Sequence, residues 1–328
     1  MKTPLYDHHV KLNGRIIDFN GWDLPLQYSG ILDEYWAVRK QSGLFDVSHM
    51  LRIDIEGNNS FPFLDWLTTN TLNRPITYTL LPNEKGGVVD DTLLYKLADD
   101  NYFIVANGSR REEDLTHLNA YKDKFGVKVT PREEMILALQ GPDSETFFPP
   151  LKKHTFVEEN GILRSSTGYT GEKGFEFFGP KEKLIPIWEE LIEKGVKPAG
   201  LGSRDSLRLE MGYALYGHEL NETIRPQETV SAWAVKNKPY LGKNDAENSW
   251  HPSAIVLTEA GIPRENYPVF KGEENVGYVT SGGFSPLLQK GIALILTSCK
   301  LSENDQVAVQ IRGKLVNGIL TQTPFVKL

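Results

Sequence analysis

The sequence predicts an α+β protein whose C-terminal part is a separate β-rich domain. The chain has 328 residues, more than one ordinary hydrophobic core contains, which indicates two or three domains. Strand-like and helical runs alternate irregularly up to Trp233, as expected for an α+β body. A polar stretch then follows, KNKPYLGKNDAENSWHP, which we interpret as a linker. Beyond it, short apolar runs between Gly, Pro and Ser turns predict a small β-barrel or β-sandwich.

Two strands and a helix are predicted in the first part of the body. The segments RIDIEG and NYFIVANG alternate polar and apolar residues, which is the pattern of half-buried strands. The segment SRREEDLTHLNAYKDKF predicts a helix with Leu115, Leu118 and Tyr121 on one face. Ser109 is its expected N-cap, and the acidic residues that follow suit the first turn of a helix.

A buried strand and a second helix are predicted later in the body. The apolar run MILALQ indicates a fully buried strand, which the dipeptide Gly141-Pro142 ends. The segment PKEKLIPIWEELIEKG has the apolar spacing of an amphipathic helix that begins near Pro180 and ends at Gly195.

The composition excludes several classes of protein. Hydrophobic residues make up 40% of the chain and charged residues 24%, which is typical of a soluble globular protein. A net charge of -7 argues against nucleic-acid binding, and the run GIALILTS is too short to span a membrane. The single cysteine, Cys299, excludes an internal disulfide, and the seven scattered histidines form no metal motif. We therefore expect a metal-free protein of the cytoplasm, although an organelle protein with its presequence removed would look the same.

Two adjacent aspartates interrupt an apolar segment, GGVVDDTLLY. Because successive side chains of a strand point to opposite faces, Asp90 lies with Val88 and Leu94, and Asp91 lies on the other face. The two carboxylates therefore cannot share one pocket, and we expect one to face a site and the other solvent or a structural partner. The alternative is that both simply follow the hairpin turn NEKGG.

Two further segments carry candidate site residues. In STGYTGEKGFEFFGP, alternation places Glu176 on the face opposite Phe175 and Phe177, where its carboxylate could accept hydrogen bonds from a flat heterocycle or an arginine. A solvated carboxylate is the alternative. In GLGSRDSLRLEMG, Ser203 is the expected N-cap of a short helix, which places Arg204 in a first turn that disfavours cations. Such a placement indicates an anionic or carbonyl partner, unless Arg204 pairs with a nearby acid.

The amino-acid sequences of these segments, and their order in the chain, resemble those of the aminomethyltransferase family, the T-protein of the glycine cleavage system. The resemblance runs from Thr3 to Phe325 and is carried by TPLYDHHVKLNGRIIDFNGWDLPLQY, VRKQSGLFDVSHM, NEKGGVVDDTLLY, LALQGP, STGYTGEKGFE, KPAGLGSRDSLRLEMGYALYGHEL, WAVK, GIPRENYPVF, VTSGGFSP and TPFV. The chain departs from the family's usual pattern at Leu51, Ala232 and Gly283, and it is shorter after Trp233.

The resemblance implies a three-domain cloverleaf with a central tetrahydrofolate channel. It implies a folate-binding α+β domain formed by residues 1–50 and 137–236, a ferredoxin-like α/β domain over 51–136, and a C-terminal β-barrel over 250–328. The implied reaction moves the methylene carbon of an aminomethyl group from the lipoyl arm of the H-protein to tetrahydrofolate, with release of ammonia. The implied partners are the lipoylated H-protein and the other glycine cleavage components.

The resemblance also implies roles for individual residues. Asp90 matches the family's essential acid, and Glu176 and Arg204 match its folate-binding residues. The further channel-wall residues that it implies are Tyr78, Tyr169 and Trp233.

Two other functions compete with this interpretation. The first is a folate-dependent demethylase of the same fold, acting on a small N- or S-methyl compound. It would differ in needing no lipoyl donor. The second is a non-catalytic folate-binding protein of iron–sulfur cluster assembly, but Cys299 does not lie in the motif K-G-C-Y-x-G-Q-E that marks that branch.

Overall fold

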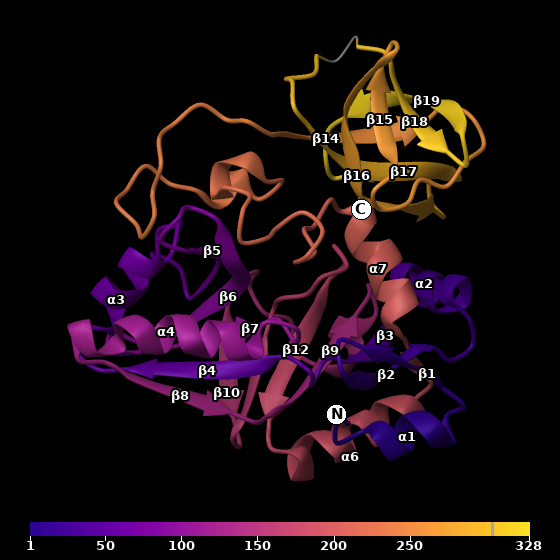
Figure 1. Cartoon of the computed structure of the whole chain (residues 1–328). Helices are drawn as coiled ribbons and strands as arrows, with labels where there is room; N and C mark the ends of the chain where they lie inside the picture. The colour runs from indigo at the N-terminus through magenta and orange to yellow at the C-terminus, as the bar shows by residue number, and fades with distance from the viewer. Residues whose placement is uncertain (303–304) are drawn as a thin grey trace. The chain divides into compact units, whose positions relative to one another are not determined.

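The computed structural model describes residues 1–302 and 305–328. They form a mixed α/β body and a C-terminal β-barrel, which is drawn in orange and yellow in Figure 1. The chain divides into two compact units, which comprise Met1–Trp66, Asn70–Thr79 and Asp91–Asp205 in the first, and Leu67–Thr69, Leu80–Asp90 and Ser206–Leu328 in the second. The three-domain boundaries expected above stay a prediction.

Two sheets and a hairpin make up the strands of the body. The hairpin pairs β1 (Arg15–Phe19) with β2 (Trp22–Gln27). The five-stranded sheet has the order β5-β6-β7-β4-β8, with β4 Leu51–Glu56, β5 Ile76–Pro82, β6 Val88–Ala98, β7 Asn101–Ala106 and β8 Lys128–Arg132. The six-stranded sheet has the order β10-β11-β12-β9-β3-β13, with β3 Gly43–Asp46, β9 Met135–Gln140, β10 Phe156–Glu159, β11 Ile162–Ser165, β12 Gly174–Gly179 and β13 Lys197–Pro198. The three strands predicted in the body are confirmed as β4, β7 and β9.

The two helices predicted from the sequence are confirmed as α4 and α6. Their bounds are Tyr6–Lys11 (α1), Ile31–Lys40 (α2), Ser60–Leu67 (α3), Arg111–Phe125 (α4), Ser144–Phe147 (α5), Lys181–Glu193 (α6) and Leu201–Glu210 (α7). Short 3₁₀ turns follow at Pro226–Glu228 (η1) and Ala232–Ala234 (η2).

The two N-cap predictions, Ser109 and Ser203, were wrong. Helix α4 has Arg110 at its N-cap position, without a side-chain cap. Helix α7 begins at Leu201, so Ser203 lies inside it and donates its hydroxyl to the Gly200 carbonyl. A serine cap contributes only about 1 kcal/mol, so packing of the helix ends overrides it. Arg204 still lies in the first turn, because its N–H donates to the same Gly200 carbonyl.

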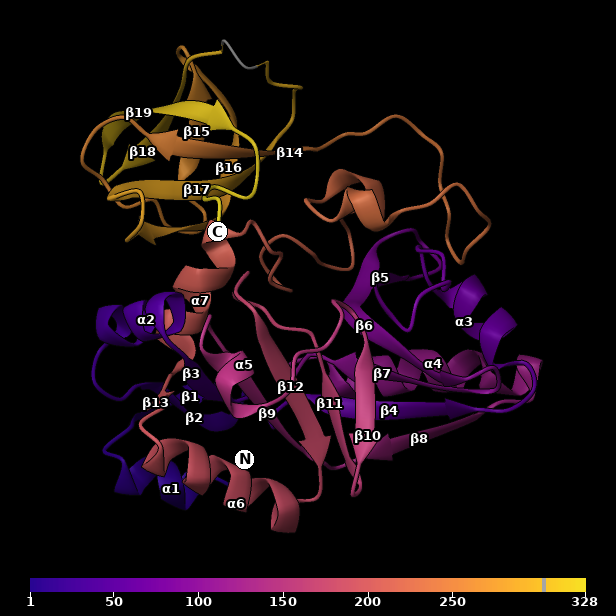
Figure 2. The same cartoon turned by 180° about the vertical axis from the view of Figure 1, so that it is seen from behind.

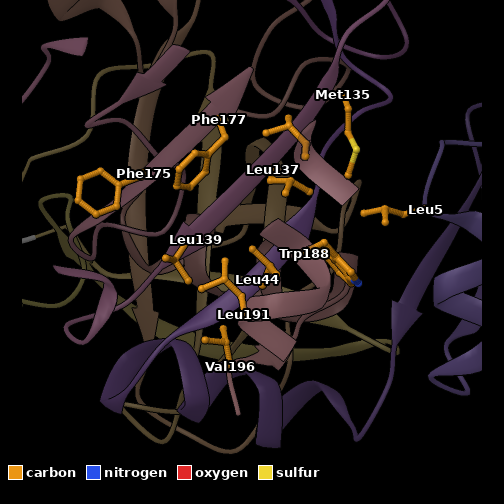
Figure 3. Close-up of a cluster of buried hydrophobic side chains, with 11 residues drawn as sticks. Leu5, Leu44, Met135, Leu137, Leu139, Phe175, Phe177, Trp188, Leu191 and Val196 are labelled. Carbon is orange, nitrogen blue, oxygen red and sulfur yellow. The ribbon is translucent and has the colours of Figure 1, made fainter. Parts of the chain in front are cut away.

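The core of the six-stranded sheet lies under helix α6. Leu184, Trp188 and Leu191 of this helix pack against Phe175 and Phe177 of β12, together with leucines of β3 and β9 (Figure 3). The next ring on β12, Phe178, lies on the opposite face and contacts Tyr95 and Phe103 of the five-stranded sheet. The alternation predicted for β12 is therefore confirmed, and Glu176 shares the face of Phe178.

Strand β6 shows the predicted alternation at its two aspartates. Asp90 is 0% exposed, like Val88 and Leu94 beside it, whereas Asp91 is half-buried on the other face. Asp91 accepts hydrogen bonds from the Tyr78 hydroxyl at 2.9 Å and from the Asn107 amide at 3.1 Å. The expected turn NEKGG joins β5 to β6, so both aspartates lie inside the strand rather than at its end.

The residue directly before this strand, Gly87, must be glycine because no side chain fits at its position. A Cβ atom on Gly87 would lie 1.8 Å from the backbone oxygen of Glu222. We expect Gly87→Ala to displace that segment and to lower the free energy of unfolding by about 1–3 kcal/mol. Urea denaturation would measure the loss. Gly318→Ala is the matched control, because Gly318, like Gly87, has no positive φ, and the nearest atom to its added Cβ lies at an ordinary contact distance of 3.5 Å. Equal losses in the two variants would contradict the steric explanation.

The C-terminal domain is a closed β-barrel, so of the two architectures predicted from its residue pattern, barrel and sandwich, the barrel is confirmed. Its order is β14-β17-β16-β15-β18-β19, with β14 His251–Leu257, β15 Pro268–Lys271, β16 Glu274–Ser285, β17 Lys290–Thr297, β18 Val307–Ile311 and β19 Lys314–Thr321. Alternate residues such as Ile255, Val279 and Val309 form its core. In the expected linker, 236–252, residues 236–250 contain no helix or strand, whereas His251 and Pro252 already belong to β14. Across the described ranges, no helix is long and apolar enough to cross a membrane.

Candidate functional site

Glu176 is a buried carboxylate in the middle of the six-stranded sheet. Strand β12, seen between β11 and β9 in Figure 2, pairs it with Ser165 on one side and Ala138 on the other. The residue is 5% exposed. Its Oε2 accepts the hydroxyl of Thr167 at 2.5 Å. Only one of the two carboxylate oxygens therefore accepts a hydrogen bond from another described side chain.

A small group of hydroxyls surrounds the Thr167 side chain. The hydroxyl of Ser165 lies 2.7 Å from that of Thr167, and the Tyr95 hydroxyl lies 3.1 Å from Ser165 and 3.2 Å from Thr167. All of these side chains are buried. The Tyr95 ring stacks on Phe103 with centroids 4.2 Å apart, so the phenol that reaches across from the five-stranded sheet is rigidly placed.

The charge state of Glu176 depends on these neighbours. Burial raises the pKa of the Glu176 carboxyl, while the Thr167 hydrogen bond and the positive charge of Arg204 lower it. Burial also raises the pKa of the Tyr95 phenol, and the Glu176 charge raises it further. Tyr95 therefore keeps its proton and can donate a hydrogen bond.

Arg204 lies beside Glu176 and stacks on Tyr169. Its guanidinium carbon is 4.8 Å from the centre of the Tyr169 ring, a cation–π distance. Burial lowers the pKa of Arg204, and the charge of Glu176 and the phenol of Tyr169 raise it, so the side chain stays cationic. Its Nη1 is buried without a hydrogen-bond partner among the described residues. The nearby acid whose charge acts on Arg204 is Glu176, but no hydrogen bond joins the two side chains in the described ranges.

The turn that carries Tyr169 is held by Gln140 of β9. The Gln140 amide donates to the Thr167 carbonyl at 3.1 Å and accepts the Thr170 hydroxyl at 2.9 Å. A Cβ atom on Gly168 would lie 1.9 Å from this side chain, which explains why the turn needs glycine there. Tyr169 is thereby presented to Arg204 from an ordered turn.

His49 is a neutral imidazole near Arg204. Burial and the charges of Arg204 and Arg111 lower the pKa of His49 to about 4, although Asp46 opposes them. Its ring meets the edge of Phe19 at 5.8 Å, and its buried Nδ1 has no partner within the part of the chain that the structure describes. A buried polar atom without a partner is costly, so His49 and Arg204 mark places where a ligand could bond.

Buried groups hold the backbone behind these residues. The Asp46 carboxylate accepts the Thr3 hydroxyl at 2.6 Å and contacts His9 Nε2 at 2.9 Å, and His9 Nδ1 lies 2.8 Å from the Tyr28 hydroxyl. Glu34, which is 0% exposed, accepts the N–H of Gly200 at 2.8 Å. Because Gly200 directly precedes α7, Glu34 anchors the end of the helix that carries Arg204.

The structure thus brings Glu176, Arg204 and Tyr169 together, while their roles in folate binding stay predictions. Tyr78 instead bonds Asp91 through its hydroxyl, and Trp233 lies in η2 with 62% of its surface exposed. Their roles as channel-wall residues, and the catalytic role of Asp90, stay predictions. No group of three or more His, Cys, Asp or Glu side chains in the described ranges could hold a metal ion.

Sequence reasoning missed Thr167, Tyr95 and His49. Thr167 and His49 lie within the quoted segments STGYTGE and DVSHM, but nothing in their local spacing marks them. Only the separation of two residues between Ser165 and Thr167 hinted at a shared face. Tyr95 lies 70 residues from Ser165 and 72 residues from Thr167 in the chain, so no local pattern reveals these contacts.

Together these side chains offer an acceptor, a fixed cation and an aromatic surface. Comparisons with known proteins show the family to which the chain belongs. The model of the GCVT N-terminal domain matches residues 5–239, and that of the glycine cleavage T-protein C-terminal barrel domain matches residues 254–327. The chain belongs to the aminomethyltransferase family of the glycine cleavage system.

Relatives of this family match along the whole chain. An aminomethyltransferase of Thermus thermophilus is 43% identical over 348 aligned positions, covering 100% of this chain and 99% of the relative. One of Bacillus cereus is 40% identical, covering 99% and 98%. The crystal structure of the glycine cleavage aminomethyltransferase T from Bartonella henselae superposes with a TM-score of 0.93 at 29% identity, covering 99% of this chain and 98% of the other. The protein is thus an aminomethyltransferase of glycine cleavage, an enzyme that transfers one-carbon units with folate.

Proposed function

We propose that this protein transfers the methylene carbon of an aminomethyl group from the lipoyl arm of the H-protein to tetrahydrofolate. The carbon gains bonds to N5 and N10 of the folate and loses its bonds to sulfur and to the amine nitrogen. The two protons displaced from N5 and N10 leave on the lipoyl thiol and on ammonia. The observation that carries this proposal is the paired Glu176 and Arg204 beside Tyr169, within a chain that matches the family from end to end.

The chemistry of Glu176 and Arg204 suits the edge of a reduced pterin. A pterin edge presents adjacent N–H donors and a carbonyl oxygen, which a carboxylate and a guanidinium complement. The Tyr169 ring offers a flat apolar surface for the heterocycle. Two buried polar atoms of the protein would gain partners from such a ligand, Nη1 of Arg204 and Nδ1 of His49.

We assign the catalytic step to the electrostatic effect of Asp90. Its carboxylate would orient the attacking N5 and stabilise the positive charge that develops there, which is catalysis by positioning and preorganised charge. Asp90 is 0% exposed, so water does not screen its charge.

The donor and the location complete the proposal. We propose that the lipoylated H-protein presents the donor, that the other glycine cleavage components act through it, and that the enzyme works in the cytoplasm. The support is the family membership.

Ammonia release from aminomethylated H-protein is the direct test of the donor. We expect release to depend on both tetrahydrofolate and the lipoyl arm, because the thioether sulfur is the leaving group. The control is H-protein that lacks the lipoyl group. Turnover of a small methylated amine or sulfonium compound, with none from loaded H-protein, would instead support the folate-dependent demethylase.

A further inference from the structure

The two oxygens of the Glu176 carboxylate have different surroundings. Oε2 accepts the Thr167 hydroxyl, whereas Oε1 accepts no hydrogen bond from any residue in the described ranges. Because the side chain is 95% buried, rotation of this carboxylate would cost it the Thr167 bond without giving it water in return. The arrangement therefore holds one oxygen in place and leaves the other available.

The hydrogen-bond direction along the hydroxyls follows from proton counting. A hydroxyl has one proton, and that of Thr167 is donated to Glu176. Thr167 therefore cannot donate to Ser165 or Tyr95 and can only accept a hydrogen bond from them. Ser165 can donate either to Thr167 or to the Glu176 carbonyl, which lies at 3.4 Å. The phenol proton of Tyr95 thus points into this group and strengthens the bond that Thr167 makes to the carboxylate.

We propose that Thr167, supported by Tyr95, is a positioning residue that fixes Glu176 so that Oε1 accepts an N–H of the reduced pterin. The inference rests on the proposed function, in which Glu176 binds folate. Thr167 itself touches Glu176 and acts on the ligand through it. The consequence is that folate affinity depends on a hydroxyl that makes no contact with folate.

Thr167 also influences the pH range in which Glu176 is a carboxylate. Burial raises the pKa of Glu176, and the Thr167 bond and the Arg204 charge oppose that rise. The other titratable group facing it is Tyr95, which stays protonated. Loss of the Thr167 hydroxyl removes one opposing effect, so Glu176 would take up its proton at a higher pH. Affinity for folate would then fall at a higher pH than in the unmodified enzyme.

The test measures the dissociation constant of tetrahydrofolate by calorimetry from about pH 4 to about pH 8, a range that begins near the ordinary glutamate pKa of about 4.3 and extends in the direction of the shift. Thr167→Val keeps the shape and removes the hydroxyl. We expect roughly tenfold weaker binding and a fall in affinity that begins at a higher pH. Thr167→Ser should restore both. Tyr95→Phe keeps the stacked ring and should change the folate affinity and its pH dependence in the same direction, but by less. This variant also provides a test if Thr167→Val folds poorly.

A matched control removes a buried threonine hydroxyl elsewhere. Thr280 is 3% exposed and donates to the Leu294 carbonyl in the barrel at 3.1 Å. Thr280→Val should cost similar stability and leave the folate affinity and its pH profile unchanged. Unchanged affinity and pH profile in both Thr167→Val and Tyr95→Phe would overturn the positioning role.

Combination with Glu176→Ala separates this inference from the proposed function. If Glu176 binds folate, Glu176→Ala weakens binding, and adding Thr167→Val to it has no further effect, because the two act through one bond. Equal losses from Thr167→Val with and without Glu176 would overturn the positioning role alone. Unchanged folate affinity in Glu176→Ala would overturn the folate site itself.

Discussion

Asp90→Asn is expected to lower the rate of aminomethyl transfer by a factor of about 10² to 10³, the scale on which loss of one preorganised electrostatic group acts. Asparagine has nearly the same shape, so the buried position should still be filled and the chain should still fold. It lacks the negative charge that would orient N5 and stabilise its developing positive charge. Folate affinity should change much less than turnover, because the proposed pterin contacts of Glu176 and Arg204 remain.

Asp91→Asn is the matched control, one residue along the same strand. Asp91 accepts hydrogen bonds from Tyr78 and Asn107, so its replacement should mainly affect stability, by about 1–2 kcal/mol. Turnover and thermal midpoint of both variants, measured side by side, separate the two roles. If Asp91→Asn abolished transfer and Asp90→Asn did not, the assignment of the two faces would be inverted.

Asp46→Ala is expected to destabilise the protein by about 2–6 kcal/mol, since it leaves two buried polar partners without their acceptor, at about 1–3 kcal/mol each. The Asp46 and His9 side chains are each 0% exposed and meet at 2.9 Å. Without the carboxylate, His9 and the Thr3 hydroxyl lose their buried partner. Urea denaturation at neutral pH measures the loss. Asp33→Ala is the control, because the exposed pair of Asp33 with Lys197 should contribute little.

The effect of Asp46 on stability should depend on pH. Burial alone would raise the pKa of Asp46, but the hydrogen bond and charge of His9, with the bonds from Ser48 and Thr3, lower it below its ordinary value. A lowered pKa in the folded state contributes stability above the ordinary aspartate pKa of about 3.9, and this stability is lost as the pH falls through the lowered value. The difference between Asp46→Ala and the unmodified protein should therefore shrink in acid. A difference that is constant over the acid range would contradict this linkage.

The local sequence pattern was sufficient to predict the face on which a side chain lies where that direction follows from the backbone alone. The alternation of a strand placed Glu176 opposite Phe175 and Phe177, and it separated Asp90 from Asp91, before any packing was known. Helix ends were less predictable. Ser109 and Ser203 have the residue type of an N-cap but do not cap, because that preference is worth little beside the packing of the helix that follows.

The sequence by itself determined the family, the α+β body, the β-rich C-terminal domain, and the identity of Glu176, Arg204 and Tyr169 as site candidates. The residue pattern left a barrel or a sandwich open for this domain, and the barrel that the resemblance implied is confirmed as a closed one. Only the tertiary structure decided that Thr167 and Tyr95 support Glu176. It likewise decided that Glu34 anchors the helix of Arg204 from 166 residues away. The physical reason is that periodicity fixes the face on which a side chain lies, whereas its hydrogen-bond partner depends on which sheet or helix packs against that face.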